Sequence, residues 1–325
     1  MKKVVWGIIG CGDVAEVKSG PAFQKIPNSQ LLAVMRRNTK KAKDFAERHR
    51  VPLWYDSVED LLGNTKINAV YIATPPSSHL EIALKAIEAG KHVYLEKPMT
   101  LSAKESETIV KALQTSKTKL TVAHYRRKLP AFLKVTELLG SQAIGDVRFA
   151  EIKVLQPPKS ALIAASEENW RINPRVSGGG YFHDLAPHQL DLMLSFFGEI
   201  NAAHGFSASQ GNLNNVDDVI NGIISFKNGV QFSGMWCFNI SERDKKDQCT
   251  IHGSKGYINF SFFGDKVSLN SETEKEVFHF DTIPHVQEPM IQATVEYFLG
   301  KASNPCSAEE GLRVMELMGK FCNKP

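Results

Sequence analysis

The stretch "VVWGIIGCGDVA" (residues 4–15) decides the fold of the first part of the chain. Its first six residues are apolar apart from one glycine, which is the pattern of a buried strand. The next six have the spacing G-x-G-x-x-A. In that spacing one glycine makes a tight turn, the next lets the backbone approach a pyrophosphate, and the third small residue allows a helix to pack on the strand. We predict a strand, a phosphate-binding turn and a helix whose N-terminus faces the phosphates, with cofactor contacts from Gly10, Gly12, Asp13 and Val14.

A second predicted strand, "QLLAVM" (residues 30–35), ends in two arginines. It begins about 20 residues after the glycine turn, as a βαβ unit requires. NAD enzymes usually carry an acid at its end to bind the ribose 2′-hydroxyl. This chain has Arg36 and Arg37 there and no acid before Asp44, and a guanidinium pairs well with a 2′-phosphate. We therefore predict NADP as the preferred cofactor and NAD as the alternative, although a solvated basic helix start would also place cations here.

Two more predicted strands end in polar residues. "INAVYIATPPSSH" (residues 67–79) and "KHVYLEKPMT" (residues 91–100) are each an apolar run followed by a loop, with a helix over about residues 80–89 between them. Ligands of open α/β sheets bind at the carboxyl ends of the strands. We therefore expect cofactor contacts from Thr74, Pro75, His79, Glu96 and Lys97.

The alternation of strands and helices stops near residue 124, and strand-like runs follow at 147–156, 219–238, 248–263 and 266–271. Asn228-Gly229 lies between alternating residues and is a strong hairpin signal; "HGSKGY" (residues 252–257) is a looser one. We predict an α/β protein: a doubly wound Rossmann domain over 1–124, and an α+β domain over 125–325 with a largely antiparallel open sheet and the C-terminal helices. One face of that open sheet needs a cover, which a partner subunit would supply.

"GGGYFHDLAPHQLDLMLSFFG" (residues 178–198) places histidines and carboxylates directly behind three glycines. Proline is tolerated in the first turn of a helix, so Pro187 predicts a helix that begins near Asp184 or Leu185. Asp184 would be its N-cap, and His188 would lie about one turn further on the same side.

Three interpretations of this stretch compete. Asp184 and His188 could be a helix cap and a semi-buried histidine, or they could be metal ligands, with His183 or Asp191 in support. A helix start orients these groups poorly for a tetrahedral ion, so we expect no metal. In the third interpretation His188 takes the hydroxyl proton of a secondary alcohol that loses hydride, because histidine titrates near neutral pH.

Two short stretches with aromatic and basic residues are candidates for substrate contacts. Tyr125 and Arg126 stand where the chain enters the second domain, and Trp170 and Arg171 precede the glycines. An aromatic ring beside a guanidinium can line a polyol or sugar-acid pocket, although solvated loop arginines would look the same.

"GCGDVA", "YIATPPSSH", "YLEKP" and the stretch 178–198 resemble, in order and spacing, the glucose–fructose oxidoreductase / inositol dehydrogenase / rhizopine-catabolism (Gfo/Idh/MocA) family, and residues 286–318 resemble its closing helices. The resemblance implies a nicotinamide-dependent alcohol–ketone oxidoreductase acting on sugars, cyclitols or relatives, assembled as a homo-oligomer. Position by position, Lys97 matches the lysine of the family's Glu-Lys-Pro motif, Asp184 its substrate-binding aspartate and His188 its catalytic histidine. Ala186 departs from the glycine that the family often has there.

These matches predict that the substrate hydroxyl lies between His188, which moves the proton, and Lys97, which stabilises the alkoxide. Two other functions remain open. The fold also serves non-catalytic dinucleotide-binding regulators, and some enzymes hold NAD tightly and use transient oxidation in a non-redox reaction such as glycoside cleavage.

Bulk properties narrow the class of protein further. The 325 residues suggest about two domains. The net charge of +4 comes without a long like-charge run, so neither nucleic acid nor an anionic membrane is the expected partner. The family resemblance implies a small sugar or polyol instead. The chain contains no long apolar run of the kind that spans a membrane. Five scattered cysteines suit a reducing cytoplasm.

Overall fold

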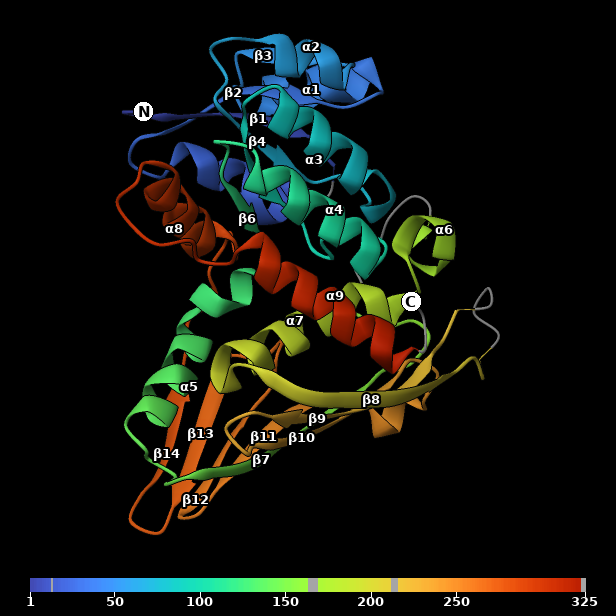
Figure 1. Ribbon diagram of the computed structural model, residues 1–325, viewed down its shortest axis with the longest axis vertical. Coiled ribbons are helices and arrows are strands. Elements are labelled where there is room, and N and C mark those ends of the chain that lie inside the picture. Colours follow the sequence, from blue (N-terminus) through green and yellow to red (C-terminus); the bar gives the residue numbers. More distant parts are fainter. Residues whose placement is uncertain (13, 163–168, 212–215, 323–325) are drawn as a thin grey trace. The chain divides into compact units, whose positions relative to one another are not determined.

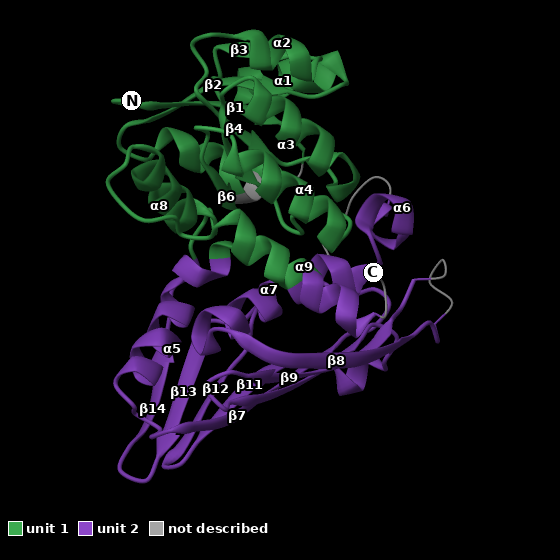
Figure 2. Ribbon diagram, in the orientation of Figure 1, with its two compact units in different colours: residues 1–125, 283–315 green, residues 126–282, 316–325 purple. Residues whose placement is uncertain are grey.

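The computed structural model describes residues 1–12, 14–162, 169–211 and 216–322 (Figure 1). Contacts divide the chain into two compact units (Figure 2): residues 1–125 with 283–315, and residues 126–282 with 316–325. The break after Tyr125 falls one residue from the expected boundary, whereas residues 283–315, expected in the second domain, group with the first unit. The reason is packing: Phe298 lies on Trp6, with ring centroids 5.6 Å apart, and Gln287 bonds to Tyr94.

Unit 1 contains a parallel sheet whose described strands follow the order β3-β2-β1-β4-β5-β6. The strands are β1 (Val4–Ile9), β2 (Ser29–Met35), β3 (Leu53–Tyr55), β4 (Ala69–Ile72), β5 (His92–Leu95) and β6 (Leu120–Val122). The helices are α1 (Thr39–Arg48), α2 (Val58–Gly63), α3 (His79–Glu88), α4 (Ala103–Gln114) and α8 (Glu288–Phe298). The central strands are buried on both faces, which explains their unbroken apolar runs and confirms the predicted doubly wound sheet.

The helix predicted after the glycine turn is irregular. It consists of a π-helical turn, η1 (Ala15–Ser19), followed by a 3-10 turn, η2 (Gly20–Gln24), instead of one α-helix. The Gly20 amide bonds to the Ala15 carbonyl, five residues back, and Pro21 then supplies no amide hydrogen for a regular helix. The predicted position of this helix is therefore correct, whereas the predicted α-helical type is wrong.

Unit 2 contains a mostly antiparallel sheet with the order β14-β13-β12-β11-β7-β10-β9-β8, in which β7 and β10 form the parallel pair. Its described strands are β7 (Val147–Leu155), β8 (Ile200–Ala208), β9 (Val219–Phe226), β10 (Gln231–Cys237), β11 (Lys246–Gly253), β12 (Gly256–Phe260), β13 (Lys266–Ser271) and β14 (Lys275–His279). The Asn228-Gly229 hairpin joins β9 to β10 as predicted, with Gly229 at φ +90°. The strands β8 and β14 were not predicted.

One face of this sheet is covered from within unit 2 by α5 (Pro130–Gly140), α7 (Tyr181–Phe197) and the end of α9 (Ala308–Phe321). Aromatic pairs between these helices and the strands are Phe132–Phe260, Phe182–Trp236, Phe197–Phe226 and Phe321–Trp236. Strand alternation therefore puts the core of unit 2 on this face. The short α6 (Pro174–Ser177) leads into the glycines before α7.

The opposite face carries exposed apolar side chains. Strand pairing places Phe149, Phe206, Ile223, Tyr257 and Val277 on it, and we call this set the open face. Phe206 is 66% exposed and Ile223 58% exposed. Among the described helices of the whole chain, none combines the length and apolar character needed to cross a bilayer.

Candidate active site

The glycine turn has the geometry that a pyrophosphate needs. Gly10 has φ +93°, and a Cβ there would stand 2.8 Å from the Thr74 amide nitrogen, so a larger residue would displace the loop after β4. At Gly12 an added Cβ would meet no described atom within 4 Å, so open space lies beside its backbone. This arrangement fits a dinucleotide phosphate approaching the main chain at Gly12. Val14 starts the helical segment, and Asp13 lies outside the described residues.

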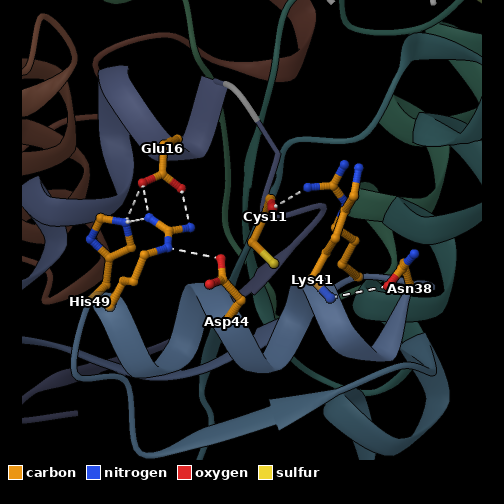
Figure 3. A network of polar contacts seen from close by, with 8 residues as sticks. Cys11, Glu16, Asn38, Lys41, Asp44 and His49 are labelled. Carbon is orange, nitrogen blue, oxygen red and sulfur yellow. Dashed lines mark hydrogen bonds and ion pairs between the residues drawn. The ribbon is translucent and has the colours of Figure 1, made fainter. Parts of the chain in front are cut away.

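A charged network, which sequence analysis missed, fixes the segment after the turn to α1 (Figure 3). The Glu16 carboxylate receives two hydrogen bonds from the Arg48 guanidinium, at 2.5 and 3.1 Å, and lies 2.7 Å from the His49 Nε2. Arg48 also bonds Asp44 at 2.8 Å. The Arg48 bonds hold the pKa of Glu16 below its usual range. The i, i+4 spacing of Asp44 and Arg48 was the available sequence signal, but their partner Glu16 lies far away in the chain.

The two arginines at the end of β2 have different surroundings. Arg36 is half-buried and donates through Nη1 to the Cys11 carbonyl in the glycine turn, at 3.4 Å, whereas Arg37 is exposed. Asn38 caps α1 by accepting a hydrogen bond from the Lys41 amide (Figure 3). The structure therefore brings Arg36, and not Arg37, to the glycine turn.

Thr74, Pro75 and His79 occupy the loop after β4. Thr74 and Pro75 are half-buried, and Thr74 accepts a hydrogen bond from the Ser78 hydroxyl at 2.8 Å. His79 is fully buried: its Nε2 lies 2.8 Å from the Thr74 carbonyl and its Nδ1 3.0 Å from the Pro98 carbonyl. Burial lowers the pKa of this imidazole. Through its two ring nitrogens, His79 thus connects the loop that follows β4 to the loop that follows β5.

Glu96 and Lys97 follow β5 directly, at the carboxyl end of the sheet. Lys97 is half-buried, and its backbone amide donates to its neighbour's carboxylate, Glu96 Oε2, at 3.1 Å. Glu96 is buried, and its Oε1 also accepts from the Tyr71 hydroxyl and the Gln287 amide, each at 2.5 Å. Glu96 is predicted from sequence as a cofactor contact, whereas no sequence pattern indicates Gln287, which lies 191 residues away.

In unit 2 the helix that carries the candidate histidine begins earlier than predicted. α7 starts at Tyr181, so the prediction of a start near Asp184 or Leu185, with Asp184 as N-cap, is wrong. The cap is Gly180, at φ +80°, a conformation that glycine adopts without strain. Pro187 lies inside the helix, beyond the first turn that begins at Tyr181, and so does not mark its start.

His188 is 3% exposed and lies edge-on to the Phe263 ring, with centroids 6.1 Å apart. The backbone amides of Phe262 and Phe263 donate to Asp247 at 3.1 and 2.7 Å, which fixes the segment that carries this ring. His183, on the same helix, is also buried, and its ring packs against Gly179.

Asp184 forms an ion pair with Arg171, whose Nε donates to Asp184 Oδ2 at 2.9 Å. The Arg171 guanidinium also lies over the Trp170 ring, 4.5 Å from its centroid. All three residues are predicted from sequence to contact substrate. The structure groups them in one cluster, in which Arg171 orients the Asp184 carboxylate.

Asp191 is 1% exposed and paired with Arg127. Arg127 Nε lies 3.0 and 2.8 Å from the two carboxylate oxygens, and Nη2 lies 2.8 Å from Oδ1. This bidentate pair anchors α7 one turn beyond His188 to the 3-10 turn η4 (Tyr125–Lys128).

The two remaining predicted substrate residues are buried. Tyr125 is 4% exposed and belongs to unit 1. Arg126 is 7% exposed and belongs to unit 2, where its guanidinium donates to the Phe262 carbonyl and lies 4.1 Å from the Phe263 ring centroid. Arg126 therefore packs around the ring that contacts His188.

The parallel sheet, the glycine turn and the polar strand ends define a class of protein, the NAD(P)-binding dehydrogenases and reductases of Rossmann type. The model of the oxidoreductase family with an NAD-binding Rossmann fold matches residues 4–124, and the model of the GFO/IDH/MocA C-terminal domain matches residues 132–259. The chain belongs to the Gfo/Idh/MocA family of oxidoreductases.

Individual relatives agree with this assignment. Oxidoreductase P35 of Formosa agariphila is 53% identical over 320 residues, 98% of each chain. The scyllo-inositol 2-dehydrogenase (NADP(+)) IolW of Bacillus subtilis is 30% identical over 195 residues, 59% of this chain and 51% of that protein. The crystal structure of an oxidoreductase from Thermotoga maritima superposes with a TM-score of 0.85 at 25% identity, covering 98% of this chain and 95% of that one.

Proposed function

We propose that this protein is an NADP-preferring oxidoreductase that interconverts a secondary alcohol and a ketone on a sugar, cyclitol or related polyol. The observation that carries the proposal is the row of polar groups at the carboxyl ends of β1, β2, β4 and β5: the glycine turn, Arg36, Thr74 and Lys97. That is where α/β sheets bind ligands. A relative named for a cyclitol and NADP(+) supports both the substrate class and the cofactor.

We assign the chemistry as follows. A bound nicotinamide supplies the acceptor or donor of hydride. His188 removes the hydroxyl proton in oxidation and returns it in reduction, because an imidazole can both accept and donate a proton. Lys97 donates to the oxygen that becomes an alkoxide and stabilises its charge. Asp184, oriented by Arg171, accepts a hydrogen bond from a neighbouring substrate hydroxyl.

The cofactor preference is tested by titrating NADPH and NADH against wild type and Arg36→Ala, followed by nicotinamide fluorescence. We expect NADPH to bind about 10- to 100-fold more weakly to the variant, since a charge-assisted phosphate bond is lost, and NADH to change little. Lys43→Ala, an exposed basic residue on α1, is the matched control. Tighter binding of NADH by wild type would contradict the assignment of Arg36.

The reaction is tested by following NADPH absorbance with a panel of scyllo-inositol, myo-inositol, aldoses and ketoses. Net oxidation or reduction of one member supports the proposal. Two other results would replace it: a cofactor that copurifies and never exchanges indicates transient oxidation in a non-redox reaction, and binding without turnover indicates a regulator.

We also propose that the open face joins two copies of the chain, because exposed apolar side chains on one sheet face usually mark an interface. Ile223→Asp is expected to raise the dimer dissociation constant by about 100-fold or more, since a buried unpaired carboxylate costs several kcal/mol. Light scattering after size exclusion measures the mass. Leu133→Asp, an exposed apolar position on α5, is the control. An unchanged mass for Ile223→Asp would contradict this interface.

A further inference from the structure

A buried hydrogen-bond network reaches the backbone amide of Lys97, the candidate catalytic lysine. It consists of Tyr71 on β4, Tyr94 on β5, Glu96, and Gln287 at the N-cap of α8. Tyr71, Tyr94 and Gln287 are 0% exposed and Glu96 is 7% exposed. All of these residues belong to unit 1.

The donor and the acceptor of each hydrogen bond in this network are defined. The Tyr94 hydroxyl donates to Gln287 Oε1 at 3.0 Å, which turns the Gln287 amide nitrogen toward Glu96 Oε1, 2.5 Å away. The Tyr71 hydroxyl donates to the same oxygen at 2.5 Å. Burial, followed by the charge of Glu96, raises the pKa of both tyrosines well above the usual value, so both stay protonated donors at neutral pH. Two side-chain donors therefore hold one oxygen of the carboxylate, and the other oxygen remains to accept the Lys97 amide.

The network reaches two other parts of the site. The Ser19 hydroxyl, at the end of the segment that follows the glycine turn, lies 3.3 Å from the Tyr71 hydroxyl. On the far side of Lys97, His79 Nδ1 lies 3.0 Å from the Pro98 carbonyl. The backbone on both sides of Lys97 is thus held by buried side chains from β4, α3 and the C-terminal segment.

A buried carboxylate is tolerated when hydrogen bonds satisfy its oxygens, and the Glu96 carboxylate accepts from Tyr71, Gln287 and the Lys97 amide. The backbone group among these donors is the amide of Lys97, so the carboxylate links the two buried side chains to the backbone of the candidate catalytic residue. We propose that Gln287 and Tyr71 are positioning residues for Lys97 and act on it through the Glu96 carboxylate. The inference rests on the proposed role of Lys97.

Amide hydrogen exchange tests, without any substrate, whether Gln287 and Tyr71 hold the Lys97 amide through Glu96. Gln287→Met keeps the length of the side chain and removes its donors, and Tyr71→Phe removes one hydroxyl from a ring that stays in place. Both are expected to speed exchange in the peptide that contains the Lys97 amide. Gln292→Met, the same change at an exposed position of α8, is expected to leave it unchanged.

Steady-state kinetics test whether this positioning supports the catalytic role of Lys97. They use NADPH and the panel member that is turned over fastest. Gln287→Met is expected to lower kcat about 10- to 100-fold, because small displacements of a catalytic group have effects of that size, with the Kd for NADPH unchanged. In a Lys97→Ala background the same substitution is expected to lower kcat no further, since residues acting through one another are not additive.

The outcomes separate the two proposals. If Gln287→Met lowers kcat equally in both backgrounds, or if neither Gln287→Met nor Tyr71→Phe lowers it at all, the positioning role is wrong while the role of Lys97 stands. If Lys97→Ala keeps full activity, the proposed role of Lys97 fails and the positioning role fails with it. Should Gln287→Met not fold, Tyr71→Phe in the two backgrounds decides the question in the same way.

Discussion

Replacement of His188 by alanine is expected to lower kcat by about 10²–10⁴-fold, the usual contribution of a general acid–base group. His188 is 3% exposed, and its neighbour Phe263 is held in place by Asp247 and Arg126. The substitution therefore removes the imidazole and leaves the residues around it in place. The loss should appear in kcat, with the Kd for NADPH unchanged, and is measured by steady-state turnover together with nicotinamide fluorescence.

Ser195→Ala is the matched control for this experiment, because Ser195 lies on the same helix and is exposed. Its kcat should equal that of the wild type. Circular dichroism of both variants checks that α7 remains folded. A His188→Ala protein that is folded and fully active would remove His188 from the mechanism.

Asp191→Ala is expected to lower the free energy of unfolding by about 3–5 kcal/mol, because it leaves the Arg127 charge buried opposite an empty space. The side chains of this pair are 9% and 1% exposed, so the guanidinium is shielded from bulk solvent. Urea denaturation measures the change. The exposed i, i+4 pair of Lys85 and Glu81 provides the contrast, since Glu81→Ala should cost no more than about 1 kcal/mol.

A paired replacement sharpens this test. Arg127→Met combined with Asp191→Leu removes both charges and keeps apolar volume, and it should recover much of the stability lost in Asp191→Ala. If Asp191→Ala were as stable as the wild type, the pair would not be the anchor of α7 that its geometry indicates.

The sequence predicted the features that depend on local chemistry. The apolar run of β1 and the spacing of Gly10 and Gly12 place the strand and turn, since a buried parallel strand and a positive φ each demand particular residue types. Asn228-Gly229 predicts its hairpin for the same reason. The Gfo/Idh/MocA resemblance, drawn from "GCGDVA", "YIATPPSSH", "YLEKP" and residues 178–198, is confirmed by the family models.

Features that depend on tertiary packing were missed. Pro187 appeared to mark a helix start, but packing of Phe182 on Trp236 and of Tyr181 on Phe238 extends α7 toward its N-terminus past the expected point. The edge strands β8 and β14 carry mixed polar and apolar residues because they are only partly buried, so their pattern is weak. Gln287 could not be paired with Glu96 from sequence, because no local rule relates residues so far apart.

The division of the chain has a consequence for the order in which this protein can fold during synthesis. Neither unit is a continuous piece of polypeptide, because unit 1 takes residues 283–315 and unit 2 takes residues 316–325. The ribosome therefore releases the parallel sheet long before Gln287 exists to bond Glu96, and the second sheet before Phe321 can pack on Trp236. Each nascent unit has an incomplete core until its last segment has been synthesised, and a gene fragment that encodes either unit whole also encodes residues of the other unit.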